Sequence, residues 1–184
     1  MNLQLLTKAV LFATEAHEGQ TRKYTGEPYI THPMAVAKMV ADFGGDFNQI
    51  LATYLHDTVE DVERVTHQII QANFGDDVAM LVHGMTKHIY PEGTTRKEKK
   101  NAEAIRLAAT DPRVQFIKGC DITHNSGTII QHDVKFGALY LQENFHAVSL
   151  MTNMQKPLRD FVLATLTAEL YKLDVLTGKV NLDS

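Results

Sequence analysis

Residues 55–61 read Leu-His-Asp-Thr-Val-Glu-Asp, and they end an apolar run that is typical of a buried helix. On a continuous helix, positions four residues apart are neighbours, which pairs His56 with Glu60. The same spacing pairs Asp57 with Asp61, and at about 100° per residue all four side chains fall in a sector of roughly 140°. Three carboxylates packed that closely are costly unless a cation, a proton or water offsets their charge. The stretch therefore predicts a metal and proton-transfer site. The alternative is a solvated helix face, which the apolar run before the motif disfavours.

The chain has 184 residues, which suffices for one sizeable core and makes two ordinary domains unlikely on size alone. We therefore expect residues 1–184 to form a single domain. Apolar residues make up 44% and charged residues 22% of the chain, which is typical of a soluble globular protein. The net charge of −4 gives no general attraction for nucleic acid or an acidic membrane, so neither is expected as a partner. The composition leaves the oligomeric state open.

Cysteine usage and hydropathy indicate a cytoplasmic protein. Cys120 stands alone, which excludes an intramolecular disulfide and fits a reducing compartment. We expect it to be a small buried hydrophobic residue rather than a nucleophile. No apolar stretch approaches the ~18 to 20 residues that cross a bilayer, and the N-terminus lacks the pattern of a secretory signal.

Apolar residues recur at helical spacing through most of the chain, and strand signals are scarce. Asp46 is a candidate N-cap for the helix that carries the opening motif, and Thr66 for the next helix. The segment 113–120 remains ambiguous between a strand and a buried helix. Further helices are expected over residues 3–18, 34–40, 68–73, 76–85, 102–109, 136–150 and 158–176. The prediction is one all-α domain.

Two more potential ligands need to converge on the opening motif for it to hold a metal. His32 lies just before Pro33, at a loop-to-helix entry, and Asp121 follows an apolar stretch that would place it at the edge of a core. With His56 and Asp57 they would form a set of two imidazoles and two carboxylates. Such mixed ligation suits Mn²⁺, Fe²⁺, Zn²⁺ or Mg²⁺ assisting a hydrolysis. Because the positions are scattered, unrelated surface groups are the main alternative.

Several ordered motifs resemble the HD-domain hydrolases of the RelA/SpoT type. They are Ala-His-Glu-Gly-Gln-Thr-Arg-Lys at 16–23, Gly-Glu-Pro-Tyr-Ile-Thr-His-Pro at 26–33 and His-Asp-Thr-Val-Glu-Asp at 56–61. Residues 85–87, Arg96 and residues 121–125 match later blocks, so the resemblance covers roughly residues 5 to 140. It implies an HD-domain helical bundle. Because the bifunctional alarmone enzymes continue into further domains and this chain ends, it resembles a stand-alone small alarmone hydrolase, like the metazoan SpoT homologue.

The resemblance also implies roles for the opening motif. The positions that match the family's metal ligands are His32, His56, Asp57 and Asp121. The resemblance implies that they bind one ion per chain, usually Mn²⁺. Glu60 and Asp61 match the acidic pair that handles the attacking water. The implied reaction is removal of the 3′-pyrophosphate from guanosine 3′,5′-bis(diphosphate), ppGpp, or from pppGpp, giving GDP or GTP and pyrophosphate.

A strongly anionic nucleotide needs polar and basic contacts. The resemblance implies that Arg22 and Lys23 lie near the nucleotide, and that Asn125 and Thr128 contact the sugar and pyrophosphate. Five basic residues could add phosphate contacts, although we expect most of them to lie on a solvated face. They are Lys87, Arg96, Lys97, Lys99 and Lys100. His17 and His124 are expected to support the site through hydrogen bonds rather than to bind metal.

Two departures from the family pattern bear on the base of the nucleotide. Ile122 stands where the family has Arg after the ligand Asp, and the loop 22–26 is one residue longer, with Tyr24 inserted. One alternative substrate is therefore an adenine alarmone (ppApp or pppApp) or the 2′-phosphate of NADPH. A second alternative is a non-catalytic nucleotide sensor, which the retained pair Glu60 and Asp61 argues against.

Overall fold

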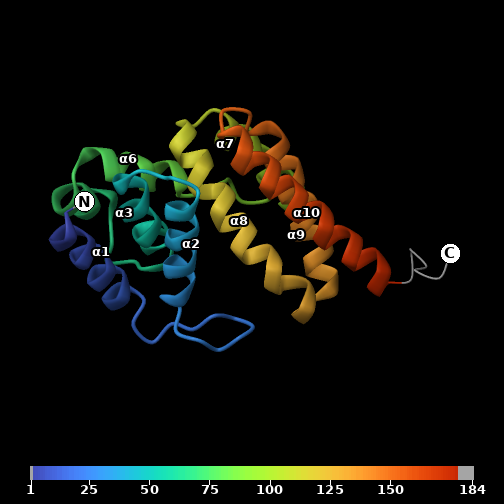
Figure 1. Cartoon of the computed structure of the whole chain (residues 1–184), viewed down its shortest axis with the longest axis horizontal. Helices are drawn as coiled ribbons and strands as arrows, with labels where there is room; N and C mark the ends of the chain where they lie inside the picture. The colour runs from blue at the N-terminus through green and yellow to red at the C-terminus, as the bar shows by residue number, and fades with distance from the viewer. Residues whose placement is uncertain (1, 178–184) are drawn as a thin grey trace.

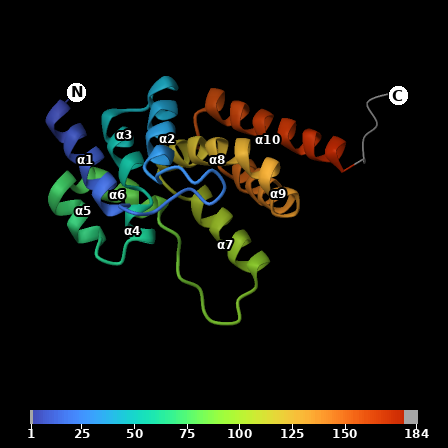
Figure 2. The same ribbon diagram turned by 90° about the horizontal axis from the view of Figure 1, so that it is seen from below.

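The computed structural model of the chain describes residues 2–177, and it is built from helices and loops with one isolated bridge between Thr21 and Pro28. The helices, shown in Figures 1 and 2, are α1 (Leu3–Ala16), α2 (Thr31–Asp42), α3 (Phe47–Leu55), α4 (Thr58–Asp61), α5 (His67–Phe74), α6 (Asp76–Met85), α7 (Arg96–Ala108), α8 (Pro112–His132), α9 (Val134–Leu150) and α10 (Lys156–Leu176). The predicted all-α fold is confirmed. Within residues 2–177, no helix is both long and apolar enough to span a bilayer.

Side-chain caps begin several helices where the sequence predicted them. The carboxylate of Asp46 accepts a hydrogen bond from the backbone of Gln49, which bonds back in a capping box at the start of α3. At the start of α5 the Thr66 hydroxyl accepts a hydrogen bond from the backbone N–H of Ile69. These caps satisfy backbone N–H groups that a helix start leaves without partners, and so they fix where α3 and α5 begin.

The ambiguous segment 113–120 is helical and lies inside α8. Val114 and Ile117 share one face of this helix and Phe116 lies on another, yet all three are almost fully buried. The cause is position: α8 packs against α2 and α6 on one side and against α9 and α10 on the other (Figure 1). A helix that is covered on both sides loses the one-faced apolar pattern that reveals most helices in a sequence.

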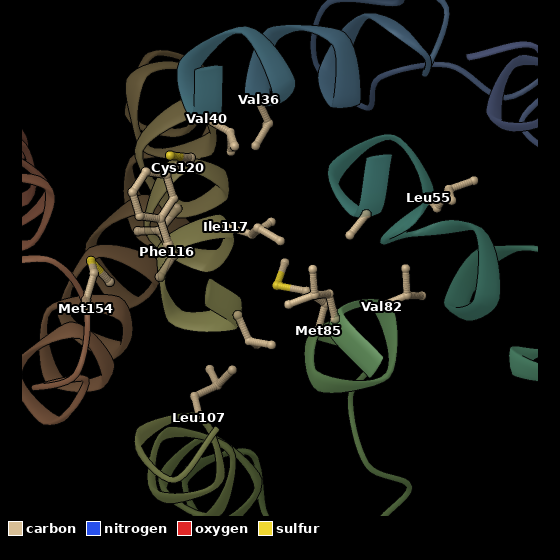
Figure 3. Close-up of a cluster of buried hydrophobic side chains, with 14 of the residues drawn as sticks. Val36, Val40, Leu55, Val82, Met85, Leu107, Phe116, Ile117, Cys120 and Met154 are labelled. Atoms are coloured by element: carbon tan, nitrogen blue, oxygen red, sulfur yellow. The ribbon is translucent and has the colours of Figure 1, made fainter. Parts of the chain in front are cut away.

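The core lies where α8 meets its neighbours. Figure 3 shows Val40 of α2, Leu55 of α3, Met85 of α6 and Leu107 of α7 around Ile117 of α8. All five side chains are buried. The ligand candidates flank this core, since His56 directly follows Leu55 and Asp121 lies one helical turn beyond Ile117. Core packing therefore sets the positions of their backbones.

The helix predicted through the opening motif is interrupted. α3 ends at Leu55 and α4 begins at Thr58, whose hydroxyl donates a 2.8 Å hydrogen bond to the Leu55 carbonyl. A side-chain donor thus satisfies a carbonyl at the end of α3. The backbone of His56 and Asp57 stays right-handed through the turn. The expectation of one continuous helical face for all four charged groups is therefore wrong.

Candidate metal centre

Four side chains converge beside the turn between α3 and α4. They are His32 from the first turn of α2, His56 and Asp57 from the turn itself, and Asp121 from the middle of α8. His32 Nε2 lies 3.2 Å from Asp121 Oδ1 and 3.7 Å from Asp57 Oδ2. His56 Nε2 lies 3.1 Å from Asp57 Oδ2 and 4.0 Å from Asp121 Oδ1. The structure brings together all four residues of the predicted ligand set, of which His32, His56 and Asp121 are buried.

The His56 ring presents a bare nitrogen to the two carboxylates. Its Nδ1 lies 2.7 Å from the Thr53 carbonyl oxygen, which only accepts, so we assign the proton of the neutral ring to Nδ1. Nε2 is buried without a hydrogen-bond partner. A buried lone pair that faces carboxylate oxygens is unfavourable unless a cation lies between them. A divalent ion with bonds of about 2.0–2.2 Å holds ligand atoms at about these separations, so the arrangement fits a divalent metal.

His124 orients the second imidazole. Its Nδ1 lies 2.9 Å from Nδ1 of His32. Burial, the charge of His32 and the charge of Arg22 lower the pKa of His124 to about 4, so this ring is neutral at pH 7. A neutral His124 can accept the Nδ1 proton of His32, which leaves His32 Nε2 bare toward Asp121. This geometry agrees with the supporting role expected for His124.

Each carboxylate is held by neighbouring donors. The Tyr29 hydroxyl donates to Asp57 Oδ2 at 2.7 Å, while Lys118 Nζ and Asn125 Nδ2 each donate to Asp121 at 2.7 Å. Burial raises the pKa of Asp121, but Lys118 and His32 outweigh it and hold this pKa well below its usual range. Neither Tyr29 nor Lys118 was predicted from the sequence to contact a ligand. The signal for Lys118 was its spacing of three residues before Asp121, which places both on one helical face.

The two acids of the predicted catalytic pair differ in their surroundings. Both carboxylate oxygens of Glu60 accept hydrogen bonds from Lys87, one from its backbone N–H and one from Nζ, each at 2.7 Å. Burial and the charges of Asp57 and Glu60 raise the pKa of Asp61, against the opposing effect of His17. Glu60 is therefore fixed by an ion pair, whereas Asp61 takes up a proton more readily than an ordinary aspartate.

Three of the four ligand candidates line one of two adjoining hollows. One, the metal cleft, has a volume of about 300 Å³ and is lined by His32, Asp57 and Asp121 together with residues of α7 and α9. The other, the loop pocket, has a volume of about 470 Å³ and is formed by residues 21–29 against α2 and α8. Tyr29 and Asn125 line both hollows, so the two are continuous.

All four predicted substrate residues line the loop pocket: Arg22, Lys23, Asn125 and Thr128. Arg22 Nη2 donates to Asn125 Oδ1 at 2.8 Å, and Asn125 in turn donates to Asp121. This chain of hydrogen bonds couples the pocket to the ligand set. The inserted Tyr24 stacks on His132 with ring centres 5.3 Å apart and forms part of the pocket wall.

The basic residues are not simply a solvated face. Lys87, Arg96 and Lys100 line the metal cleft, and Lys87 and Arg96 are also exposed to solvent. Lys97 and Lys99 are exposed, as expected. Lys118 adds a cation to the cleft that the sequence analysis did not identify.

The two residues that flank Asp121 belong to the core. Ile122 is 1% exposed, so its side chain packs in the core rather than lining the cleft where an Arg could meet a substrate. Cys120 is also buried, and burial together with the charge of Asp121 raises the pKa of its thiol to about 12. Cys120 is thus a small buried hydrophobic residue, as expected, and is unsuited to be a nucleophile.

The chain is similar to known proteins over most of its length. A family profile described as an HD domain matches residues 9–139. The chain is 41% identical over 133 residues to the bifunctional (p)ppGpp synthase/hydrolase SpoT of Escherichia coli K12, a match that covers 69% of this chain and 18% of SpoT. It is 42% identical over 128 residues to a probable guanosine-3′,5′-bis(diphosphate) 3′-pyrophosphohydrolase of Synechocystis, covering 68% and 17% of the two chains. The chain thus spans about a fifth of the length of these relatives.

The fold is also similar to that of solved structures. A metazoan orthologue of SpoT, described as hydrolysing ppGpp, superposes with a TM-score of 0.74 at 21% identity and covers 96% of this chain and 97% of its own. A protein of Listeria monocytogenes superposes with a TM-score of 0.60 at 21% identity, covering 76% and 99%. The profile match spans most of the chain and includes all four residues of the ligand set. The chain belongs to the HD domain family.

Proposed function

We propose that this chain is a metal-dependent 3′-pyrophosphohydrolase of ppGpp and pppGpp, releasing GDP or GTP and pyrophosphate. The observation that carries the proposal is the convergence of two bare imidazole nitrogens and two carboxylates on a cleft lined by cations. The names of the relatives support the substrate, because those proteins are described as guanosine-3′,5′-bis(diphosphate) 3′-pyrophosphohydrolases. We further propose that residues 1–184 work as a single catalytic domain.

The metal would be held by His32, His56, Asp57 and Asp121, and we propose one Mn²⁺ per chain. When bound there, a divalent ion supplies Lewis-acid polarisation of a phosphoryl oxygen. The residues around it set its surroundings: Tyr29 orients Asp57, while Lys118 and Asn125 orient Asp121. Such outer contacts fix the ligands in one geometry.

Glu60 and Asp61 handle the attacking water in this proposal. A carboxylate that orients the water or takes its proton makes the oxygen a better nucleophile toward phosphorus. Asp61 suits proton uptake because its pKa is raised, by burial first and by Asp57 second. Glu60 suits orientation because Lys87 fixes both of its oxygens.

The nucleoside would lie in the loop pocket. The guanidinium of Arg22 is planar and always charged, which suits it to stack on a base or to bind phosphate. Lys23 carries a point charge near the rings of Tyr24 and Phe136, at 5.0 and 5.8 Å from their centres. Asn125 lies between Arg22 and Asp121, and so relates the nucleoside to the ligand set.

A second candidate keeps the metal site but changes the nucleotide to an adenine alarmone or NADPH. Tyr24 favours it, because this inserted residue stands in the wall of the loop pocket and can alter the choice of base. A binding protein without catalysis is the third possibility.

One assay separates these functions. The purified chain is incubated with Mn²⁺ and each nucleotide, and pyrophosphate and orthophosphate are measured separately. Pyrophosphate from ppGpp is the expected product. Pyrophosphate from ppApp alone, or orthophosphate from NADPH alone, would favour the second candidate, and tight binding without turnover would favour the sensor.

Two variants test the division of roles. Asp57→Ala should lose bound Mn²⁺ and turnover together, because it removes a ligand. Glu60→Gln should bind Mn²⁺ like the original chain but lose turnover by about 10²-fold or more, because an amide lacks the charged oxygens that pair with Lys87 and orient the water. Mn²⁺ affinity by calorimetry and initial rates check both. A fully active Glu60→Gln variant would contradict the role given to Glu60.

A further inference from the structure

A third hollow continues the metal cleft on the side away from the loop pocket. We name it the α7 pocket; it has a volume of about 400 Å³ and is lined by Lys87, Tyr90, Arg96, Lys99, Lys100 and Glu103, among others. Lys87, Arg96, Lys100 and Glu103 also line the metal cleft, so the two hollows are continuous. In Figure 2, α7 and the loop that precedes it lie at one edge of the molecule, with α8 between them and α2. Together the three hollows form one trench.

The α7 pocket carries an excess of positive charge. Its one acid, Glu103, is already paired with Arg106, whose Nη2 lies 2.6 Å from its carboxylate. Lys87 pairs with Glu60, and Arg96 with Glu143. Among residues 2–177, the ammonium of Lys99 forms no ion pair, and that of Lys100 lies 3.8 Å from the nearest carboxylate oxygen, on Glu143. Two ammonium groups are therefore left with little or no compensation.

Mutual repulsion shows in the behaviour of Lys100. Burial lowers its pKa, and the charges of Lys118, Arg96 and Lys87 lower it further against the opposing effect of Glu143. Cations gathered at this density are stabilised by an anion that binds several of them at once. A diphosphate group presents several charged oxygens and matches this need.

α8 gives the trench a direction. Lys118, Asp121, Asn125 and Thr128 follow one another at intervals of three or four residues along one face, over about 15 Å of helix. Asn125 and Thr128 lie at the loop pocket, Asp121 at the ligand set, and Lys118 in the cleft with the cations of α7. A nucleoside in the loop pocket with its 3′-phosphate at the ligand set would therefore extend its outer phosphate toward α7.

We propose that the α7 pocket binds the pyrophosphate group that leaves the nucleotide, with Lys99 as a contact beyond the ligand set. The proposal rests on the proposed function. In the reaction the water oxygen bonds to the inner 3′-phosphorus while the bond from that phosphorus to the ribose O3′ breaks. O3′ takes a proton, and pyrophosphate that contains the water oxygen remains on the α7 side.

The pocket can be tested by binding of inorganic pyrophosphate in the absence of divalent metal, measured by calorimetry. Without metal, Asp57 and Asp121 repel the ligand, and dependence on Lys99 separates binding in the α7 pocket from binding at Arg22 and Lys23 of the loop pocket. Lys99→Gln should weaken binding by about fivefold or more, because it removes an unpaired ammonium. The control is Lys97→Gln, which removes the same charge from the same helix at a side chain that does not line the α7 pocket, and should bind within about twofold of the original chain.

Equal pyrophosphate binding by the two variants, or no binding by the original chain, would overturn the proposal that the α7 pocket binds pyrophosphate. The ppGpp assay is independent of this result. Lys99-dependent binding in a chain that does not hydrolyse ppGpp would retain the pocket and reject the proposed function. Hydrolysis of ppGpp together with equal pyrophosphate binding by both variants would retain the proposed function and reject the pocket.

Discussion

Lys118 illustrates how a single buried charge can set the properties of a metal ligand. Its ammonium donates to Asp121 at 2.7 Å, and its side chain is 19% exposed. Burial lowers the pKa of Lys118, but Asp121 outweighs that effect and the net shift is upward. The pair therefore stays ionised, and Lys118 keeps Asp121 in the orientation that faces His32.

We predict that Lys118→Met weakens Mn²⁺ binding by about 10- to 100-fold, the usual cost of losing an outer contact to a metal ligand. Calorimetric titration with Mn²⁺ measures the effect. Lys172→Met is the control, because it removes an ion pair with Glu169 on α10 whose lysine is 60% exposed. Unchanged affinity in Lys118→Met would show that Asp121 needs no such support.

At the level of residues, the sequence predicted the ligand set better than the side chains that contact it. His32, His56, Asp57 and Asp121 could be matched because a family motif marks each of them. The contact of Tyr29 with Asp57 spans 28 positions and depends on how a loop folds against a helix. Neither periodicity nor spacing contains that information.

The N-termini of three helices meet at one guanidinium. Arg113 of α8 contacts Asp77 of α6 at 2.8 Å, Asp111 at the start of α8 at 3.3 Å and Asp46 at the start of α3 at 3.6 Å. Hydrogen bonds from Arg113 and Asn48 hold the pKa of Asp77 below its ordinary value of 3.8. Acids at helix starts are favourable in themselves, and the shared arginine links three of them.

This network predicts a pH-dependent effect of Asp77→Asn. A pKa that is lower in the folded than in the unfolded chain adds stability above the unfolded value, and this is lost as the pH falls through the folded value. The variant should be less stable by about 0.5–1 kcal/mol at pH 7, since the site is partly exposed, and the difference should close below about pH 4. Urea unfolding at several pH values measures it, with Asp42→Asn as the control for loss of an exposed charge. A difference that does not shrink between pH 5 and pH 2 would contradict this account.

Close helix packing predicts opposite effects for two glycines. A Cβ at Gly84 of α6 would lie 2.6 Å from Val114 Cγ2, and Val114 is fully buried in α8. Gly84→Ala should therefore destabilise the fold by about 1–3 kcal/mol. At Gly127 of α8 a Cβ would meet nothing within 4 Å, so Gly127→Ala should stabilise by about 0.5–1 kcal/mol. Midpoints of denaturant unfolding measure both effects. A midpoint of Gly84→Ala equal to that of the original chain would indicate that α6 and α8 can move apart without cost.

At the level of elements, caps and apolar periodicity predicted most helices and their starts. Two features escaped that approach for physical reasons. The segment 113–120 is buried on several sides, so its periodicity is weak. The break between α3 and α4 depends on the Thr58 hydroxyl replacing a backbone donor, and the apolar pattern continues across it.

Across the whole molecule, the ligand set joins two groups of helices. In Figure 1, α1, α2, α3 and α6 lie on one side of α8, and α9 and α10 on the other. His32, His56 and Asp57 come from the first side and Asp121 from α8. Without a cation, two carboxylates and two imidazoles meet at this junction with their lone pairs opposed, so binding of metal should stabilise the fold as well as the site.

We therefore predict that Mn²⁺ at about 100 times its dissociation constant adds about 2.7 kcal/mol to the free energy of unfolding. For a chain of this size that corresponds to a rise of roughly 5–10 °C in melting temperature. Thermal unfolding with and without Mn²⁺, and after addition of a chelator, measures the shift, which the chelator should abolish. Asp57→Ala should show little or no shift, whereas Asp42→Ala, which removes an exposed acid paired with Lys38, should shift like the original chain. An equal shift in Asp57→Ala would mean that Mn²⁺ stabilises the protein from another place, and the ligand set would then not be the metal centre.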